Sequence, residues 1–294
     1  MIEQALFQHL QSQAVLNPFM ATYAGNKAIF NQEAPADTDE LWGNGSQYGR
    51  IVFSVDLSGD PERILGGLLA VDISCNENEE NQIPEEIEPI VRELIHGYFF
   101  SNGKFVVAAQ WKNTNYFTEP KNEVSGCTIA FDLLAFPILT TSDPDVIARI
   151  NEWTSSNFEG LHVINHDELP STAWKPSGND SAVYWRTVQE TPATWIPDTF
   201  QTIWRTANLK CHIFSQDISA ATTVARDIVT GLYADKRLLK PGETPIMVNR
   251  RNTQENGADP LRTGQVSVEA TYAVIVYRKN SPPMNHTNMT ERSK

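Results

Sequence analysis

The sequence predicts an α+β fold in which one small unit occurs twice, each copy packing helices on a mostly antiparallel sheet. Residues 91–98 return as residues 225–232, so that the arginine, the acidic residue beside it and a later glycine recur at an offset of 134 residues. Residues 29–33 return as residues 163–167 at the same offset. Self-similarity at one fixed spacing indicates internal duplication. We therefore expect two tandem domains, residues 1–137 and residues 145–279.

The first unit is predicted to open with a helix, because Ile2, Ala5, Leu6 and Leu10 recur at helical spacing. A loop rich in proline and glycine, residues 32–48, follows a short strand. Alternating or continuous apolar runs predict the strands of this unit, which are residues 27–31, 50–56, 68–75, 104–117 and 126–136.

A second helix is predicted at residues 84–96. Pro84 suits the first helical position, and Gly97 suits the position just beyond the end. The apolar residues form a one-sided stripe, which consists of Ile87, Ile90, Val91, Leu94 and Ile95. This helix is expected to bury that stripe against the sheet.

The second unit is predicted in the same order. Asp143 and Pro144 are the expected cap and first turn of a helix that carries Ile147, Ile150 and Trp153. Strands are expected at residues 161–165, 181–188, 209–215, 245–253 and 265–278, with a loop at residues 170–180. A second helix carries five apolar residues, each 134 after its counterpart: Ala221, Val224, Ala225, Ile228 and Val229. Gly231 is expected to end this helix as Gly97 ends the first.

The remaining segments are predicted to connect or to trail. Residues 137–144 contain prolines, threonines and a serine and are the expected linker between the domains. Residues 280–294 contain almost nothing apolar, so we expect a tail that is disordered or that orders on a partner.

Composition excludes several classes of protein. The formal charge of −13 disfavours sequence-independent binding to nucleic acid. No apolar run is long enough to span a membrane, and the N-terminus does not resemble a signal peptide. Three cysteines fit free buried thiols in a reducing compartment. The acidic residues concentrated between positions 77 and 88 are expected to form a solvated loop that leads into a helix N-terminus.

Motifs for catalysis or for cofactor binding are missing from the sequence. His162, His166 and Asp167 suggest a metal site, but the segment is predicted as a strand, and residues four apart there lie about 13 Å from each other. The Gly-rich segments at residues 43–45 and 66–67 lack the context of a phosphate loop. We therefore predict no catalytic residue, no metal ligand and no cofactor.

Three sets of residues are candidates for contacts between proteins. Arg92 with Glu93, and Arg226 with Asp227, are either surface ion pairs or arginines that reach a neighbouring subunit. Loop tryptophans either bind a partner or fill space beneath a loop, and these are Trp42, Trp174 and Trp195. The second unit also has a basic edge that suits an acidic partner or the next copy of the chain, and it comprises Arg237, Lys240, Arg250 and Arg251.

The first unit resembles the tail terminator, or tail completion, proteins of long-tailed bacteriophages. The resemblance lies in the N-terminal helix, residues 18–21, residues 28–35, a Trp-containing loop and residues 47–56, and it covers residues 1–137. Gly49 stands where the family pattern has proline. The duplication also departs from the single unit that is usual in the family.

The resemblance implies a non-enzymatic virion protein of the tail or neck, assembled in the host cytoplasm. Such a protein forms a ring on the last ring of the tail tube, ends tube polymerisation and presents a surface to the head or neck. Its partners would be further copies of itself, the tail tube protein, head–tail connector or neck proteins and, in a contractile tail, the sheath. Six chains, or three duplicated chains as a pseudo-hexamer, would close the ring around a lumen through which DNA could pass.

Other functions remain open. The chain could be a tail tube or other neck component, which would polymerise into long tubes. An enzyme would show titratable groups converging in a pocket between the repeats. A cellular adaptor would stay monomeric without its partner.

Overall fold

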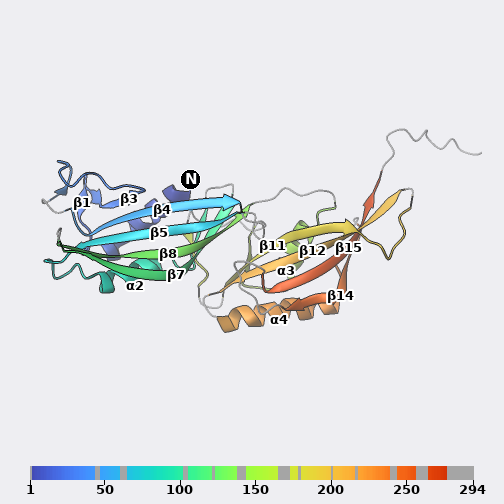
Figure 1. Ribbon diagram of the computed structural model, residues 1–294. Coiled ribbons are helices and arrows are strands. Elements are labelled where there is room, and N and C mark those ends of the chain that lie inside the picture. The colour runs from blue at the N-terminus through green and yellow to red at the C-terminus, as the bar shows by residue number, and fades with distance from the viewer. Residues whose placement is uncertain are drawn as a thin grey trace, which may run out of the picture.

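A computed structural model gives the structure of the chain. It describes residues 2–43, 47–59, 65–101, 105–120, 123–137, 144–164, 173–177, 180–199, 201–215, 218–238, 244–255 and 264–276. Two sheets with helices against them make the fold α+β, which confirms the predicted class. Figure 1 shows the two sheets lying end to end, so the described chain is elongated.

The first unit comprises residues 2–137. Its helices are α1 (Ile2–Ser12) and α2 (Pro84–Ile95). Its strands are β1 (Thr22–Tyr23), β2 (Asn26–Lys27), β3 (Ile29–Asn31), β4 (Arg50–Gly59), β5 (Leu65–Asn76), β6 (Phe99–Ser101), β7 (Phe105–Glu119) and β8 (Val124–Pro137). The large sheet has the order β6-β7-β8-β5-β4-β3, in which β3 and β4 are parallel and the other pairs antiparallel.

The second unit comprises residues 144–276. Its helices are α3 (Val146–Asn157) and α4 (Ile218–Asp235). Its strands are β9 (Leu161–Val163), β10 (Ala173–Trp174), β11 (Ser181–Pro192), β12 (Thr202–Phe214), β13 (Arg237–Leu238), β14 (Ile246–Glu255) and β15 (Val266–Ile275). Its sheet has the order β13-β14-β15-β12-β11-β9, with β9 and β11 parallel and the other pairs antiparallel.

The two sheets therefore have the same strand order and the same parallel pair at one edge. The pairing registers also correspond. Ile51 lies opposite Ile73 in the first sheet, and Val183 lies opposite Ile213 in the second. All four side chains are buried in the core of their own unit.

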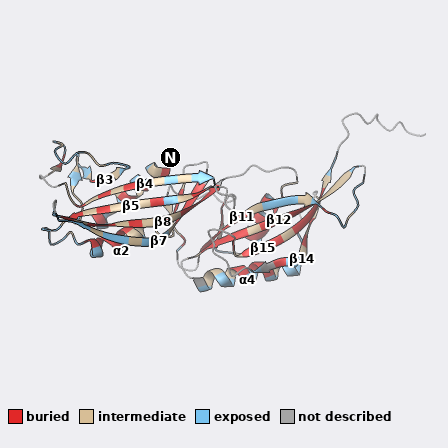
Figure 2. Ribbon diagram, viewed as in Figure 1, coloured by how far each residue is buried: buried red, intermediate tan, exposed pale blue. Residues whose placement is uncertain are grey.

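Each unit buries one face of its sheet beneath its two helices, as the alternation of buried and exposed residues along the strands shows (Figure 2). In the first unit, Leu69, Val71 and Ile73 of β5 point into the core, as their alternation predicts. In the second unit, Leu209 and Cys211 do so from β12. Area removed from water stabilises such a core at roughly 25 cal/mol per Å² of apolar surface.

Helix α2 forms as predicted. Pro84 lies in its first turn, and Gly97 beyond its end has a positive φ of 76°. Ile87, Val91 and Ile95 are buried, while Ile90 and Leu94 are partly buried against the same core. The predicted N-terminal helix is also confirmed as α1, and the four apolar residues that predicted it are all buried.

Two predicted helix ends are wrong. The cap of α3 is Asp145, whose Oδ1 accepts a hydrogen bond from the Ala148 amide at 2.7 Å, and Pro144 precedes this cap. Asp143 lies outside the described residues. Gly231 does not end α4, which continues to Asp235, since this glycine lacks the positive φ of Gly97; its missing side chain instead leaves room for Trp153. A Cβ at this glycine would lie 3.1 Å from the indole.

Strand β1, which lies in the segment between the first helix and the strand predicted at residues 27–31, was not predicted, and neither were three further short strands. Strands β6 and β13 follow α2 and α4, and β10 lies in the segment expected to be a loop. Strands β4, β5, β8 and β11 extend beyond their predicted ends, β12 begins seven residues earlier than predicted, and β15 is shorter than predicted. His166, Asp167, Lys240, most of the expected linker and the whole 280–294 tail lie outside the described residues.

Candidate functional sites at the unit junction and on a basic groove

The two units are joined by strand β10 of the second, which pairs with β6 of the first and extends the first sheet to the order β10-β6-β7-β8-β5-β4-β3. Ala173 lies opposite Phe100, and Trp174 lies opposite Phe99. The Trp174 ring centroid is 5.4 Å from that of Phe99 and 4.7 Å from that of His162. This tryptophan therefore bridges the two units.

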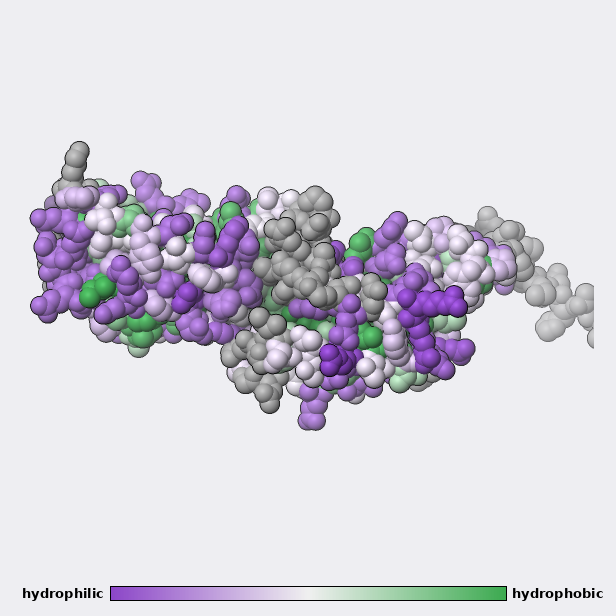
Figure 3. Space-filling model, turned by 60° about the horizontal axis from the view of Figure 1, so that its bottom comes forward, coloured by the Kyte–Doolittle hydropathy of each residue, from purple (hydrophilic) through white to green (hydrophobic). Residues whose placement is uncertain are grey.

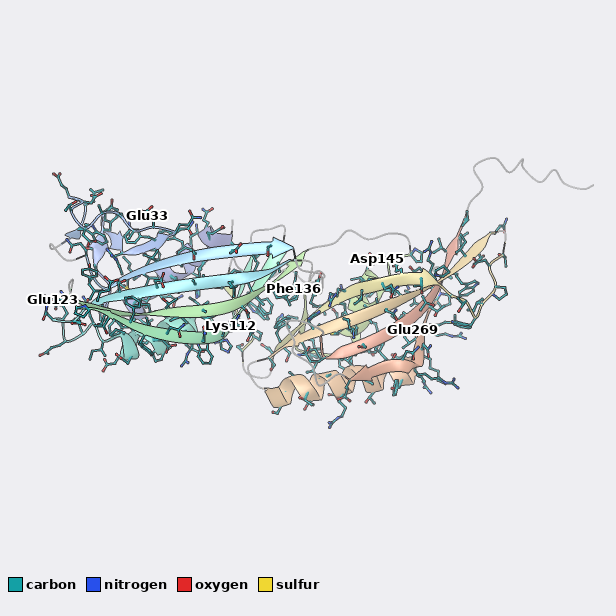
Figure 4. All side chains as sticks on the ribbon, viewed as in Figure 1. Glu33, Lys112, Glu123, Phe136, Asp145 and Glu269 are labelled. Atoms are coloured by element: carbon teal, nitrogen blue, oxygen red, sulfur yellow. The ribbon has the colours of Figure 1, made fainter. Side chains whose placement is uncertain are left out.

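An apolar cluster continues the junction behind β10. Phe136, labelled in Figure 4 at the end of the first sheet nearest the second unit, has its ring centroid 4.5 Å from Tyr184 and 5.2 Å from Phe214. Phe99 packs edge-on against Phe214 at 5.2 Å. Aromatic pairs at these separations add to the stability gained from burial alone. The cluster holds the end of one sheet against the start of the other.

A pocket of about 250 Å³ opens beside this cluster. Both units line this junction pocket, with Glu93, His96, Gly97 and Gln110 from the first and Lys175, Pro176, Phe214 and Ser215 from the second. Lys175 Nζ lies 2.5 Å from Glu93 Oε1, which is an ion pair across the junction. The same ammonium lies 5.5 Å from the centre of the Tyr98 ring.

His96 is the residue that an enzyme would use in this pocket. Its Nδ1 accepts the Trp111 backbone N–H at 3.0 Å, so the neutral ring carries its proton on Nε2. Burial, and then the positive charge of Lys175, lowers the pKa of His96, which keeps the ring neutral. In this tautomer Nε2 donates and cannot accept a proton from a nucleophile.

Ser215 Oγ is buried without a hydrogen-bond partner among the described residues. It lines the pocket with His96, but the tautomer of that ring supplies no acceptor to activate a hydroxyl. The titratable groups of the junction pocket thus bind one another: Glu93 and Lys175 form an ion pair across the junction.

A second hollow, of about 580 Å³, lies at the end of the second unit away from the first. We call it the basic groove, and it is lined by Trp195, Lys236, Arg237, Met247, Val248, Asn249, Arg250, Arg251 and Thr271. Strongly hydrophilic side chains gather over this end of the molecule (Figure 3). Trp195 is 62% exposed, so a large apolar ring stands in water beside four cationic side chains.

Charge is divided unequally between the units. Residues 1–137 contain 19 acidic and 7 basic residues, and residues 138–294 contain 17 and 16. The net charges are therefore −12 and −1, so nearly all of the excess acidity belongs to the first unit. The basic groove lies at the end of the second unit that is away from this acidic half of the chain.

The predicted arginine–acid pairs do not form as such. Arg92 lies 3.6 Å from Glu88 and over the Trp111 ring, while Glu93 pairs with Lys175. Arg226, whose side chain is 68% exposed, lies 3.9 Å from Glu255. The two arginines thus have partners on their own unit.

Glu88 also departs from the prediction of a solvated acidic segment. It is only 4% exposed and accepts a hydrogen bond from Thr114 Oγ1 at 2.7 Å. Glu77, Glu79, Glu80 and other carboxylates of the segment are exposed as expected. The helical register decides this difference, because Glu88 follows Ile87 on the face that turns toward the sheet.

The three loop tryptophans have different surroundings. Trp42 is 8% exposed and packs against Tyr23 and Phe30, with ring centroids at 5.0 and 5.7 Å. It therefore fills space beneath its loop, whereas Trp174 joins the units and Trp195 faces solvent.

His162, which the sequence pattern suggests as a metal ligand, contacts a carboxylate and an aromatic ring. His162 Nε2 lies 4.0 Å from Asp180 Oδ2 and packs edge-on against Trp174. Within the described part of the chain, no three His, Cys, Asp or Glu side chains gather closely enough to hold a metal ion. Cys75, Cys127 and Cys211 are free and buried, as predicted, and burial raises the pKa of Cys75 to about 12.

None of the helices that the structure describes is both long and apolar enough to pass through a membrane.

Comparison with known proteins gives a weak structural similarity and no match by sequence. No family model matches the chain, and no curated protein matches it. A chain of the solved structure described as "Virion of native gene transfer agent (GTA) particle" is 14% identical, with a TM-score of 0.32. The match covers 45% of this chain and 92% of that chain. A TM-score this low does not establish a shared fold, so neither fold nor function follows from the similarity.

Proposed function

We propose that this chain is a non-enzymatic structural protein of a phage-like virion, and that it is a tail terminator. In this role it closes into a ring on the last ring of the tail tube, ends tube polymerisation and presents a joining surface to the head or neck. The resemblance of residues 1–137 to tail terminators motivates the proposal.

The observation that carries it is the repeated topology with a directional junction. The same strand order occurs twice, and corresponding positions are buried in both cores, which supports a tandem duplication. One unit contacts the other through different surfaces, with β10 of the second added to the β6 edge of the first. Units that associate head to tail form a ring when the rotation closes and a filament when it does not.

The junction pocket supports a structural role over catalysis. Its carboxylate and ammonium groups neutralise each other, and His96 is held in a tautomer that cannot act as a base from Nε2. An enzyme with a site at the junction would need the opposite arrangement of donor and acceptor.

The experiment is light scattering after size exclusion, with negative-stain images of the same peak, followed by addition of the protein to assembling tail tube protein. We expect a closed ring of three or six chains and a shortening of the tubes as its concentration rises. Long tubes formed by this chain alone would favour a tail tube component. A ring that leaves tube length unchanged would contradict the capping function.

A further inference from the structure

We propose that residues 32–43 of one copy, which are the described first part of the 32–48 loop, dock in the basic groove of the next copy. Within the chain, β10 of the second unit packs on the β6 edge of the first sheet. The proposed contact would place the corresponding segment of one chain on the β13 edge of the next chain. This inference rests on the proposed function, because it names the contact that would close the ring.

The basic groove occupies the same place on the second sheet as the junction pocket does on the first. Phe100 pairs with Val107 at the edge of the first sheet, and Leu238 pairs with Ile246 at the edge of the second. Counted from these pairs, Gln110 corresponds to Asn249, and each lines its own hollow. The hollows are thus one feature of the fold that occurs in both units.

The two copies of this feature differ in what covers them. In the first unit, β10 and the residues after it cover the edge at β6. In the second unit, β13 is the edge strand of the described sheet, and Arg237 on it is exposed. An edge strand presents unpaired N–H and C=O groups that can pair with another chain.

The counterpart of β10 in the first unit is residues 41–42. Trp174 precedes Val183 by nine residues, and Trp42 precedes Ile51 by nine. Val183 and Ile51 are equivalent by their pairing registers. Leu41, which corresponds to Ala173, is 55% exposed. In Figure 1, β1 and β3 beside this loop lie at the end of the first unit remote from the second.

Charge favours this occupant. The loop contains four carboxylates, which are Glu33, Asp37, Asp39 and Glu40. Asp37 is paired with Arg50, and Asp39 accepts hydrogen bonds from Tyr23 and from the Leu41 amide. Glu33 and Glu40 remain exposed. They would meet the four cationic side chains of the basic groove, just as Glu93 meets Lys175 at the junction.

The contact between chains would be more polar than the junction within the chain. Phe99, Ala108 and Leu134 face the second unit at the junction. Their counterparts by register are Arg237, Met247 and Thr271, all of which line the basic groove. A contact with fewer aromatic residues and more charge is suited to assembly from separate chains.

The test reverses one charge on each side of the contact. Arg237→Glu and Glu40→Arg should each shift the full-length protein from the ring to the monomer by at least about tenfold in dissociation constant, as expected for loss of a central charge pair. The variant that carries both changes should recover the ring. Arg226→Glu and Glu80→Arg make the same charge changes at exposed positions outside the contact and should leave the ring intact.

Mixing the two single variants tests whether the number of chains in the ring is even. Arg237→Glu chains and Glu40→Arg chains can associate only in alternation, since each altered groove accepts only the altered loop. The mixture should give closed rings only if the ring contains an even number of chains, as six does and three does not. Circular dichroism melting curves would show that each variant folds.

The outcomes separate this inference from the proposed function. A wild-type ring that both reversals leave intact, or that single reversals disrupt without rescue by the double variant, would overturn the contact. A monomeric wild type would overturn it as well. If the charge-reversal variants behave as expected but the wild-type ring does not cap tubes, the contact is upheld and the capping role is overturned. Binding of a duplex DNA probe that Arg237→Glu abolishes, with no effect on the ring, would assign the groove to nucleic acid instead.

Discussion

At the scale of single residues, His96 gives a prediction about pH. Burial, and then Lys175, lowers its pKa below the usual 6.5, so the unfolded chain takes up a proton more readily than the folded chain as the pH falls. The stability that neutral His96 contributes is present above about pH 6.5 and is lost below it. The free energy of unfolding should therefore fall between pH 7.5 and 5.5, about the range in which histidine titrates.

The variant His96→Asn isolates this effect. Its Oδ1 can accept the Trp111 N–H as Nδ1 does, but it does not titrate. Urea unfolding should show a smaller loss of stability over the same pH range than in the wild type. Equal losses in the two proteins would mean that His96 does not contribute to the pH dependence.

Gly97 gives a second prediction at this scale. Its φ of 76° lies in the left-handed region, so Gly97→Ala should cost about 1 kcal/mol in unfolding free energy. The control is Gly59→Ala, because that glycine has no positive φ and a Cβ there would meet nothing within 4 Å. Chemical denaturation of both variants checks the difference, and equal stabilities would contradict the backbone explanation.

At the scale of elements, strand β10 determines how the units are joined, and Trp174 is its main side-chain anchor. Trp174→Ala should remove the contacts with Phe99 and His162, release β10 and raise hydrogen exchange at β6. The expected cost is about 2–3 kcal/mol, below that for a fully buried tryptophan because this ring is only partly buried. Trp195→Ala removes a ring that is 62% exposed and should leave both stability and exchange at β6 unchanged.

At the scale of the whole molecule, the acidic first unit and the basic groove of the second predict that assembly is sensitive to salt. The first unit has a net charge of −12, and the basic groove lies at the other end of the chain. Raising NaCl from about 0.1 M to about 1 M shortens the Debye length from ~10 Å to ~3 Å. The ring should dissociate over this range in sedimentation velocity, while the melting temperature of the separated chain changes little. A ring that tightens with salt would indicate an apolar contact.

Local sequence determined most of the regular elements. The stripe from Ile87 to Ile95 and the alternation from Leu69 to Ile73 predicted α2 and β5, because each element buries one face at its own period. The predicted N-cap of α3, Asp143, lies two residues before the observed N-cap, Asp145, because an aspartate at either position is an acceptable cap. The role of Gly231 could not be predicted, since it depends on Trp153 from another helix.

The sequence by itself determined the α+β class, the two predicted helices of each unit and the repeated pattern of buried residues. Only the tertiary structure decided that β10 pairs with the first sheet and that the two-residue strand β13 forms an edge of the second sheet. It also decided that the junction pocket and the basic groove lie at corresponding places in the two units. A strand of two residues has no periodicity to detect, and β10 pairs with β6, a partner that is far away in sequence. The surfaces that we propose to assemble the ring therefore appear only when both sheets are in place.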